Sequence, residues 1–223
     1  MTESSRVNMT VAGLATVSTL MAALGHLWWK TDIFEATAFV TAVISIYLLA
    51  VESVWGWPFG VVSSGIYVYV FAVGGLPADA GLNLFYVGML LHGWFVWARK
   101  RLPSAPFVIS RAGARGWVLA ALACAGLSAV HYPIVLAAHG KVPVWDSVLA
   151  SASYVGQYMQ NTKKLENWLL WIVVDLLYCP LYLSRGLYLT AILYVVLAGL
   201  AFFGLQKWRH NGVQLPLIDG QGS

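Results

Sequence analysis

Long apolar stretches separated by short polar ones dominate the pattern of the chain. Seven stretches have the length, about 20 mostly apolar residues, that a helix needs to cross the hydrocarbon of a membrane. They cover residues 36–51 (with a start as early as 33), 59–76, 81–98, 117–138, 144–161, 168–183 and 187–205. The connections between them are short, except for residues 99–116. The pattern therefore predicts an all-α membrane protein with seven spanning helices.

Residues 7–27 form a further, more polar stretch that carries Asn8, His26 and several Ser and Thr residues. It is an eighth span, an interfacial helix or a poor signal sequence. A signal peptide begins with basic residues, whereas here Arg6 is the only basic residue before the stretch and Glu3 offsets it. We therefore expect an extra N-terminal helix that is interfacial or spanning.

Composition supports a membrane protein and excludes several other classes. Of the 223 residues, 60% are hydrophobic and 10% are charged, against about 25% charged residues in soluble domains. The mean hydropathy is +0.73. A soluble protein of this composition would expose much apolar surface to water, so a soluble globular enzyme, a disordered chain and a disulfide scaffold are excluded.

The basic residues indicate the orientation. Residues 99–116 contain five basic residues and no acid, so the positive-inside rule places this loop in the cytoplasm. Alternation of the spans then places residues 162–166 and the C-terminus inside as well, with nine basic residues inside and three outside. Trp94, Trp97, Trp117 and Trp208 fall at the inner boundary and Trp145 at the outer one, where an aromatic belt is expected.

The chain contains an internal repeat. A shift of 111 residues brings Trp57 onto Trp168, Gly93 onto Gly204 and Trp97 onto Trp208 without a gap. Matched Trp and Gly pairs are rare by chance. The repeat unit is three helices, and the single helix between the copies gives both the same orientation. This predicts a parallel 3+1+3 bundle, an arrangement that occurs in secondary transporters.

We accordingly expect six segments. They are an N-terminal segment (1–32), a first three-helix repeat (33–98), a cytoplasmic basic loop (99–116), a linker helix (117–140), a second three-helix repeat (141–210) and a disordered tail (211–223).

The stretch 168–183 carries the clearest candidate site. Trp168, Trp171, Asp175, Tyr178 and Tyr182 are spaced three or four residues apart and form one stripe of a helix. An ionised carboxylate at this depth costs about 3 kcal/mol even on a mild insertion scale. Aromatic rings attract cations, so the stripe favours a flat, positively charged solute. The alternative is a protonated, structural Asp175.

Other polar residues in the spans are candidate ligand contacts. Gln157 lies deep in the stretch 144–161. Ser64 is equivalent to Asp175 in the repeat, and Asn83 is equivalent to Tyr194. We list the substrate-binding candidates as Trp168, Trp171, Asp175, Tyr178, Gln157, Tyr194, Asn83, Ser64 and Tyr67. Helix–helix hydrogen bonds are the alternative role for these groups.

The remaining polar residues suggest no chemistry. Glu35 and Asp146 stand at the starts of two spans, where acids favour helix N-termini, so we expect capping. His92 and His131 belong to no metal-ligand spacing, and the chain has no Walker A, nucleophile-elbow or HExxH motif. We expect no metal site, no cofactor, no nucleic-acid partner and no enzyme activity.

Several runs resemble the PnuC family of bacterial vitamin transporters. They are WDS at 145–147, ENWLLW at 166–171, GLYLTA at 186–191, WPFG at 57–60 and HGWFVW at 92–97. The resemblance covers roughly residues 33–210 and implies a 3+1+3 helix plan like that of the SWEET sugar carriers. It implies a multi-pass protein of the bacterial inner membrane, with its C-terminus in the cytoplasm, that carries nicotinamide riboside by facilitated diffusion. It also implies trapping of the vitamin by a cytoplasmic kinase, a homotrimer, and a substrate site that includes Trp168, Trp171 and position 175.

The chain departs from that family at one place. Nicotinamide riboside carriers of the family often have Asn at the position of Asp175, whereas relatives proposed to carry thiamine or riboflavin resemble this chain more closely there. A thiamine or riboflavin carrier, with or without proton coupling through Asp175, is therefore the alternative. An intramembrane enzyme would need two or more acids or a metal triad, and a scaffold subunit would need no site.

Overall fold

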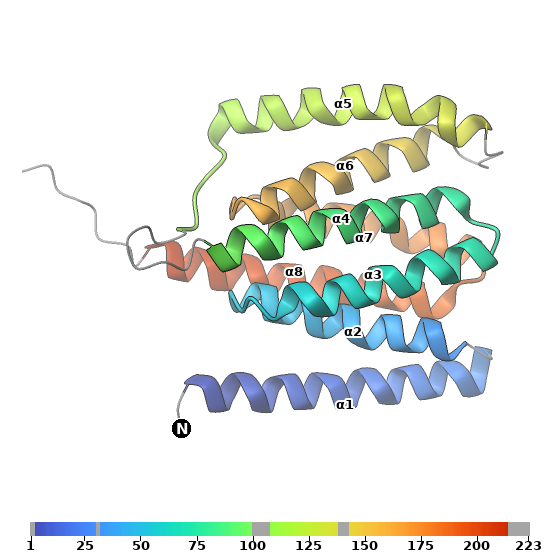
Figure 1. Ribbon diagram of the computed structural model, residues 1–223, viewed down its shortest axis with the longest axis horizontal. Helices are drawn as coiled ribbons and strands as arrows, with labels where there is room; N and C mark the ends of the chain where they lie inside the picture. The colour runs from blue at the N-terminus through green and yellow to red at the C-terminus, as the bar shows by residue number, and fades with distance from the viewer. Residues whose placement is uncertain (1–2, 30–31, 100–107, 138–142, 214–223) are drawn as a thin grey trace, which may run out of the picture.

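The computed structural model describes residues 3–29, 32–99, 108–137 and 143–213. Within these ranges the chain forms eight helices. They are α1 (Glu3–Trp29), α2 (Ile33–Ala50), α3 (Gly56–Val73), α4 (Pro77–Arg99), α5 (Gly113–Ala137), α6 (Pro143–Asn161), α7 (Asn167–Ser184) and α8 (Tyr188–Val213). All eight run side by side along the long axis of the molecule (Figure 1). Residues 100–107 of the basic loop and residues 214–223 of the expected tail lie outside the described residues.

Six helices form a closed ring. Each packs against its neighbour in the order α2, α3, α4, α6, α7, α8 and back to α2. The two repeats, α2–α4 and α6–α8, therefore meet along two seams, α4 against α6 and α8 against α2. The 3+1+3 plan predicted from the sequence is confirmed, with α5 as the linker between the repeats.

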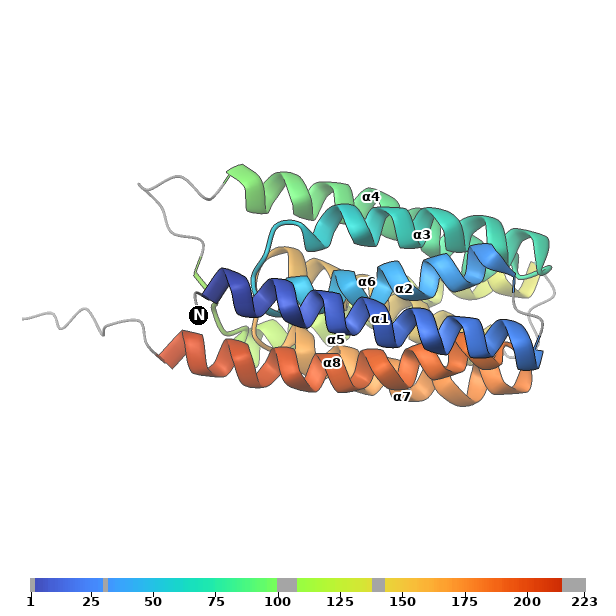
Figure 2. The ribbon, with the colours of Figure 1, turned by 90° about the horizontal axis from the view of Figure 1, so that it is seen from below.

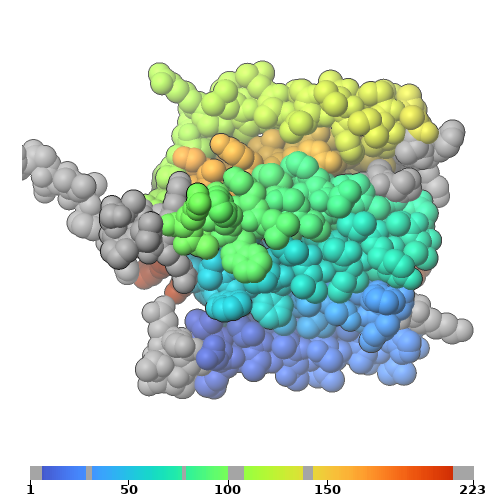
Figure 3. Space-filling view, in the orientation of Figure 1, coloured from blue at the N-terminus to red at the C-terminus, as the bar shows by residue number. Residues whose placement is uncertain are grey.

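The helices α1 and α5 lie outside the ring on opposite flanks (Figures 1 and 3). α1 packs mainly on α2, and α5 packs on α6. The shift of 111 residues that relates the repeats also moves Glu3–Trp29 to 114–140, which nearly coincides with α5. The extra N-terminal helix therefore occupies the place in the first half that the linker helix occupies in the second.

Seven of the described helices are long and apolar enough to cross a membrane. They include residues Val7–Trp28 of α1, the stretch that the sequence left open. The described beginning of α1 and the end of α8 lie at the same end of the bundle (Figure 2), as an even number of crossings requires.

Among the described helices, α6 is the one that composition does not identify as a membrane span, because it carries many polar residues. Its serines bond within the helix: the Ser151 hydroxyl donates to the Ser147 carbonyl (2.7 Å) and the Ser153 hydroxyl to that of Leu149 (2.8 Å). α6 packs against α4, α5 and α7. Its polar face is thus covered by protein, which removes the cost of exposing it to lipid.

Matched contacts confirm that the repeat is structural. The indole Nε1 of Trp97 donates to the Asn161 carbonyl (3.2 Å), and that of the equivalent Trp208 donates to the equivalent carbonyl, Ala50 (3.1 Å). Each bond joins one repeat to the other. The expectation that Trp97 and Trp208 belong to an aromatic belt is wrong, because both are buried, whereas Trp94, Trp117 and Trp145 are exposed.

The burial of Trp208 also explains why α8 continues beyond its predicted end at residue 205. The last turns of α8 pack on the protein: Trp208 is fully buried, and the Asn211 amide donates to the Glu52 carboxylate (2.8 Å).

Candidate functional site

A cavity lies within the ring of six helices. Every ring helix contributes to its wall, and α1 and α5 do not. The wall combines aromatic rings with a few polar groups, an arrangement typical of small-molecule sites. None of its lining residues is Lys, Arg or His, and Asp175 is its only acid.

The structure brings eight of the nine predicted residues to this cavity. They are Ser64, Tyr67, Asn83, Gln157, Trp168, Trp171, Asp175 and Tyr194. The ninth, Tyr178, is buried but does not line the wall. Its ring instead packs on those of Tyr182 and Tyr194, with centroids 5.7 and 5.1 Å away. Helical spacing alone predicted that Tyr178 lines the wall, whereas in the structure Tyr194 of α8 lines it and Tyr178 packs behind.

Asp175 is the most unusual group of the cavity. It is 3% exposed, and among the described residues no donor makes a hydrogen bond to its carboxylate. Its repeat equivalent, Ser64, lines the same cavity from α3. A buried, unpaired carboxylate is costly unless a cation or a proton accompanies it. The site can therefore stabilise one positive charge.

Trp171 and Gln160 form a linked pair beside Asp175. The Trp171 indole donates to the Gln160 side-chain oxygen (3.1 Å), which holds the indole in place. The Gln160 amide nitrogen is buried and has no partner among the described residues. Tyr86 tilts against Trp171, with ring centroids 6.2 Å apart. The pair therefore offers a ring face and a free N–H donor to a ligand.

Gln157 is held by a second chain of hydrogen bonds. Its amide donates to the Asn161 side-chain oxygen (2.9 Å), and the Asn161 amide donates to the Met89 carbonyl (2.9 Å) and contacts His92 Nδ1 (3.2 Å). This chain joins α6 to α4, so part of the polar character of α6 serves the seam between the repeats.

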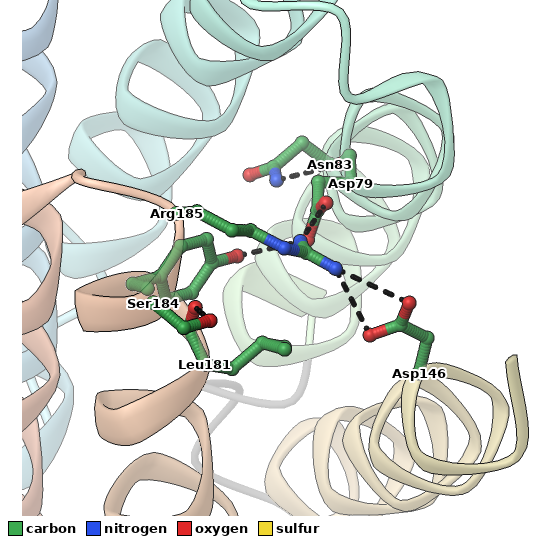
Figure 4. A network of polar contacts seen from close by, with 7 residues as sticks. Asp79, Asn83, Asp146, Leu181, Ser184 and Arg185 are labelled. Carbon is green, nitrogen blue, oxygen red and sulfur yellow. Dashed lines mark hydrogen bonds and ion pairs between the residues drawn. The ribbon is translucent and has the colours of Figure 1, made fainter. Parts of the chain in front are cut away.

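An ionic cluster joins three helices at one end of the ring (Figure 4). The Arg185 guanidinium donates to Asp79 (2.6 Å) and to both oxygens of Asp146 (3.1 and 3.2 Å), while the Tyr182 hydroxyl donates to Asp79 (3.0 Å). Asp79, Asp146 and Arg185 belong to α4, α6 and the end of α7. The cluster therefore spans the seam between the repeats.

The cluster corrects the capping roles expected for two acids. Asp146 binds Arg185 rather than serving only as a cap. Its repeat equivalent, Glu35, is buried and accepts a hydrogen bond from the Thr190 hydroxyl (2.6 Å), across the other seam. Thr190 is in turn the repeat equivalent of Asp79. The two seams are thus joined at equivalent pairs of positions. Thr190 bonds directly to Glu35 across one seam, whereas Asp79 and Asp146 are joined through Arg185 across the other.

An ion pair joins the repeats at the opposite end. The Lys163 ammonium lies 2.6 Å from the Glu52 carboxylate and 4.6 Å from the ring centroid of Trp97. Glu52 follows α2 and Lys163 follows α6. Charged contacts therefore tie the repeats together at both ends of the cavity, where a carrier needs gates that open in turn.

Polar residues outside the nine predicted contacts also line the cavity. Among them are Gln160, Tyr86 and Thr190. A signal existed for Gln160, since it lies three residues after Gln157 on the same polar stripe. Tyr86 lies three residues after Asn83 and belongs to the polar groups of the first repeat that the sequence offers as possible ligand contacts, whereas only the packing of α8 shows that Thr190 faces inward.

Comparison with known proteins identifies the family. The family model described as nicotinamide mononucleotide transporter matches residues 32–210, most of the chain. The chain belongs to this family. α1 lies outside the matched residues, as expected from the resemblance that covers roughly residues 33–210. Transport by a helical membrane carrier, rather than enzyme catalysis, is thus the activity of the family.

Two relatives and one solved structure agree with this assignment. The nicotinamide riboside transporter PnuC of Escherichia coli is 22% identical over 79% of this chain and 85% of its own length. The riboflavin/roseoflavin transporter RibM of Streptomyces davaonensis is 24% identical over 87% of this chain and 92% of its own. A crystal structure of the vitamin B3 transporter PnuC superposes with a TM-score of 0.76, at 20% identity and 92% coverage of both chains. The last comparison shows a shared fold.

Proposed function

We propose that this protein carries nicotinamide riboside across the bacterial inner membrane by facilitated diffusion. The observation that carries the proposal is the unpaired Asp175 carboxylate in an aromatic cavity between the two repeats. Nicotinamide riboside has a flat pyridinium ring with a permanent positive charge. The carboxylate balances this charge, and Trp171 and Tyr194 offer ring faces for stacking.

The same cavity favours the riboside over the mononucleotide that gives the family its description. Charged phosphate groups are bound most strongly by cationic side chains, and the lining residues include no Lys, Arg or His. Asp175 would also repel it. A cytoplasmic kinase that phosphorylates the riboside therefore makes a product that this cavity rejects, which would trap the vitamin inside the cell.

Riboflavin is the second candidate, supported by the similarity to RibM. Its ring system is neutral, so it leaves the Asp175 charge unbalanced unless the carboxyl is protonated. Thiamine, an aromatic cation, fits the charge as well as nicotinamide riboside does. A proton on Asp175 during uptake of a neutral vitamin would make transport proton-coupled.

The placement in the membrane follows from the charges. We place the described ends of α1 and α8 in the cytoplasm together with Arg111, Arg115 and Lys164. The Arg185 cluster then lies outside and the Glu52–Lys163 pair inside. We retain the homotrimer as an expectation. The exposed apolar side chains of α1 and α5 leave both flanks available to lipid or to other copies.

The test is uptake into liposomes that contain the purified protein. Labelled nicotinamide riboside should equilibrate across the membrane without a pH gradient, and entrapped kinase with ATP should convert equilibration into accumulation. Nicotinamide mononucleotide should not enter. Uptake of thiamine or riboflavin with exclusion of nicotinamide riboside would overturn the substrate, and uptake that requires an inward proton gradient would favour the coupled carrier.

A further inference from the structure

A second, largely apolar crevice lies outside the transport ring, between α4 and α5. Figure 3 shows α6 recessed between these two helices. α5 packs on α6 and on no other described helix to a comparable extent. Its inner row contacts α6 through Cys124, whose thiol lies 3.9 Å from the Val148 carbonyl, and Ser128, whose hydroxyl donates to the Ser147 carbonyl (3.5 Å). The side of α5 that faces α4 is left open and lines the crevice.

The wall of the crevice is apolar along its length and basic at one end. Leu119, Ala123 and Leu127 of α5 face Phe85 and Met89 of α4 in its lining. Arg115 and Lys164 are the charged residues among its lining residues, and none of these is acidic. The nearby Glu166 carboxylate accepts a hydrogen bond from the Ala112 backbone N–H (2.9 Å).

Backbone hydrogen bonds bring the two cations to the same mouth. The Ser110 N–H donates to the Lys163 carbonyl (3.0 Å), and the Leu165 N–H donates to the Ser110 carbonyl (2.9 Å). These bonds tie the start of α5 to the turn between α6 and α7. The positions of Arg115 and Lys164 are therefore set by the fold and not by chance proximity of long side chains.

The dimensions match one leaflet of a membrane. Leu127 lies twelve residues after Arg115, or roughly 18 Å along the helix, and a leaflet contributes about 15 Å of hydrocarbon. With Arg115 at the headgroup level, Leu127 lies near the midplane. The crevice is thus open to lipid along its length and cationic where a phosphate group would lie.

From this geometry we propose that the crevice binds an anionic phospholipid of the inner leaflet. One acyl chain lies along Leu119, Ala123 and Leu127, and the phosphate lies between Arg115 and Lys164. The bound lipid fills the space between α4 and α5, so it connects the linker helix to the first repeat. This proposal is independent of which vitamin the central cavity carries.

Native mass spectrometry of the purified full-length protein tests the proposal. Phosphatidylglycerol and phosphatidylcholine with identical acyl chains, and inorganic phosphate, serve as probes. We expect one retained phosphatidylglycerol per chain and little phosphatidylcholine. The double variant Arg115→Gln/Lys164→Gln should lower phosphatidylglycerol affinity about 30-fold, or about 2 kcal/mol. The matched control Lys207→Gln/Arg209→Gln removes two basic residues from α8, away from the crevice, and should retain the lipid.

A second pair of variants tests the acyl chain. Ala123→Trp fills the crevice and should expel the lipid with both cations intact, whereas Ala121→Trp, on a face of α5 outside the crevice lining, should not. Equal retention of phosphatidylcholine, or equal losses in the two double variants, would overturn the proposal. Displacement of the lipid by inorganic phosphate, with no effect of Ala123→Trp, would also overturn it and would indicate a free-anion site. A change of oligomeric state alone would overturn it as well and would indicate an interface between copies. Nicotinamide riboside binding is measured on the same samples, so failure of the transport proposal is seen separately.

Discussion

Glu52 and Lys163 occupy equivalent positions of the two repeats, and their side chains form an ion pair of 2.6 Å across the seam. Both residues have left-handed backbone conformations, with φ of 59° and 53°. The two turns that follow α2 and α6 are thus joined at one end of the cavity by a contact between equivalent residues.

The pair predicts a charge-reversal result. Glu52→Gln or Lys163→Met should each lower stability by about 2 kcal/mol, between the values for exposed and buried pairs. The exchange Glu52→Lys/Lys163→Glu should recover most of this loss. Recovery is incomplete because the cation then lies away from Trp97. Thermal unfolding in detergent measures the effect, and an exchange variant no more stable than the single variants would contradict the prediction.

Two equivalent glycines, Gly93 and Gly204, lie too close to an indole ring to accept a methyl group without strain. A Cβ on Gly204 would lie 2.7 Å from the Trp168 ring, and one on Gly93 would lie 2.3 Å from the ring of Trp57. Ala at either position should destabilise the protein by about 1–3 kcal/mol through overpacking. Gly204→Ala should also weaken vitamin binding, because Trp168 lines the cavity and Trp57 does not.

The matched controls are Gly88→Ala and Gly199→Ala, at another pair of equivalent positions. A Cβ meets nothing within 4 Å at either one, so these variants should gain about 0.5–1 kcal/mol from helix propensity. Similar melting temperatures for all four variants would mean that the close approach of helix to indole does not exist.

The pair of Gln160 and Trp171 predicts coupled losses of binding. Gln160→Leu removes the free amide donor and leaves the Trp171 indole N–H without its acceptor. Affinity for nicotinamide riboside should fall about tenfold, the value of one to two hydrogen bonds. A double-mutant cycle with Trp171→Phe measures the coupling. If Gln160 acts only by holding Trp171, its loss has no further effect in the Trp171→Phe background; if its amide contacts the ligand, part of the effect remains.

The Arg185 cluster predicts a loss of stability that a second substitution reverses. Arg185→Gln leaves Asp79 and Asp146 buried without their cation, which should cost about 3–5 kcal/mol. Adding Asp79→Asn and Asp146→Asn removes the unpaired charges and should restore most of the melting temperature. An Arg185→Gln variant as stable as the unaltered protein would show that the cluster does not hold the seam.

The sequence predicted the fold well because its strongest signals are physical requirements of a membrane. Apolar length defines spans, and the matched residues Trp57 with Trp168 and Gly93 with Gly204 revealed the repeat. In the structure each of these indoles packs on the glycine of its own repeat. Polar groups inside spans are costly, so Asp175 and Gln157 were conspicuous, and both line the cavity.

What the sequence did not predict depends on which helices are neighbours. Asp146 and Glu35 look like helix caps until α7 and α8 supply Arg185 and Thr190. Tyr178 follows the helical stripe of Asp175, yet its ring packs on those of Tyr182 and Tyr194 and does not line the cavity. Trp97 looks like a boundary residue until its carbonyl acceptor on α6 is known. Periodicity locates the face of one helix, but it does not show what packs on that face.

Asp175 is proposed to select a cationic vitamin. Calorimetric titration with two forms of one nucleoside tests this selection most directly. Nicotinamide riboside is a cation, and its reduced dihydro form is uncharged with nearly the same shape. The unaltered protein should prefer the cation by about 10- to 100-fold, a fraction of the energy that a close charge pair has at an effective dielectric constant near 20. The nearly isosteric Asp175→Asn should bind both forms alike. Equal binding of the two forms by the unaltered protein, or a preference that survives in Asp175→Asn, would contradict the account.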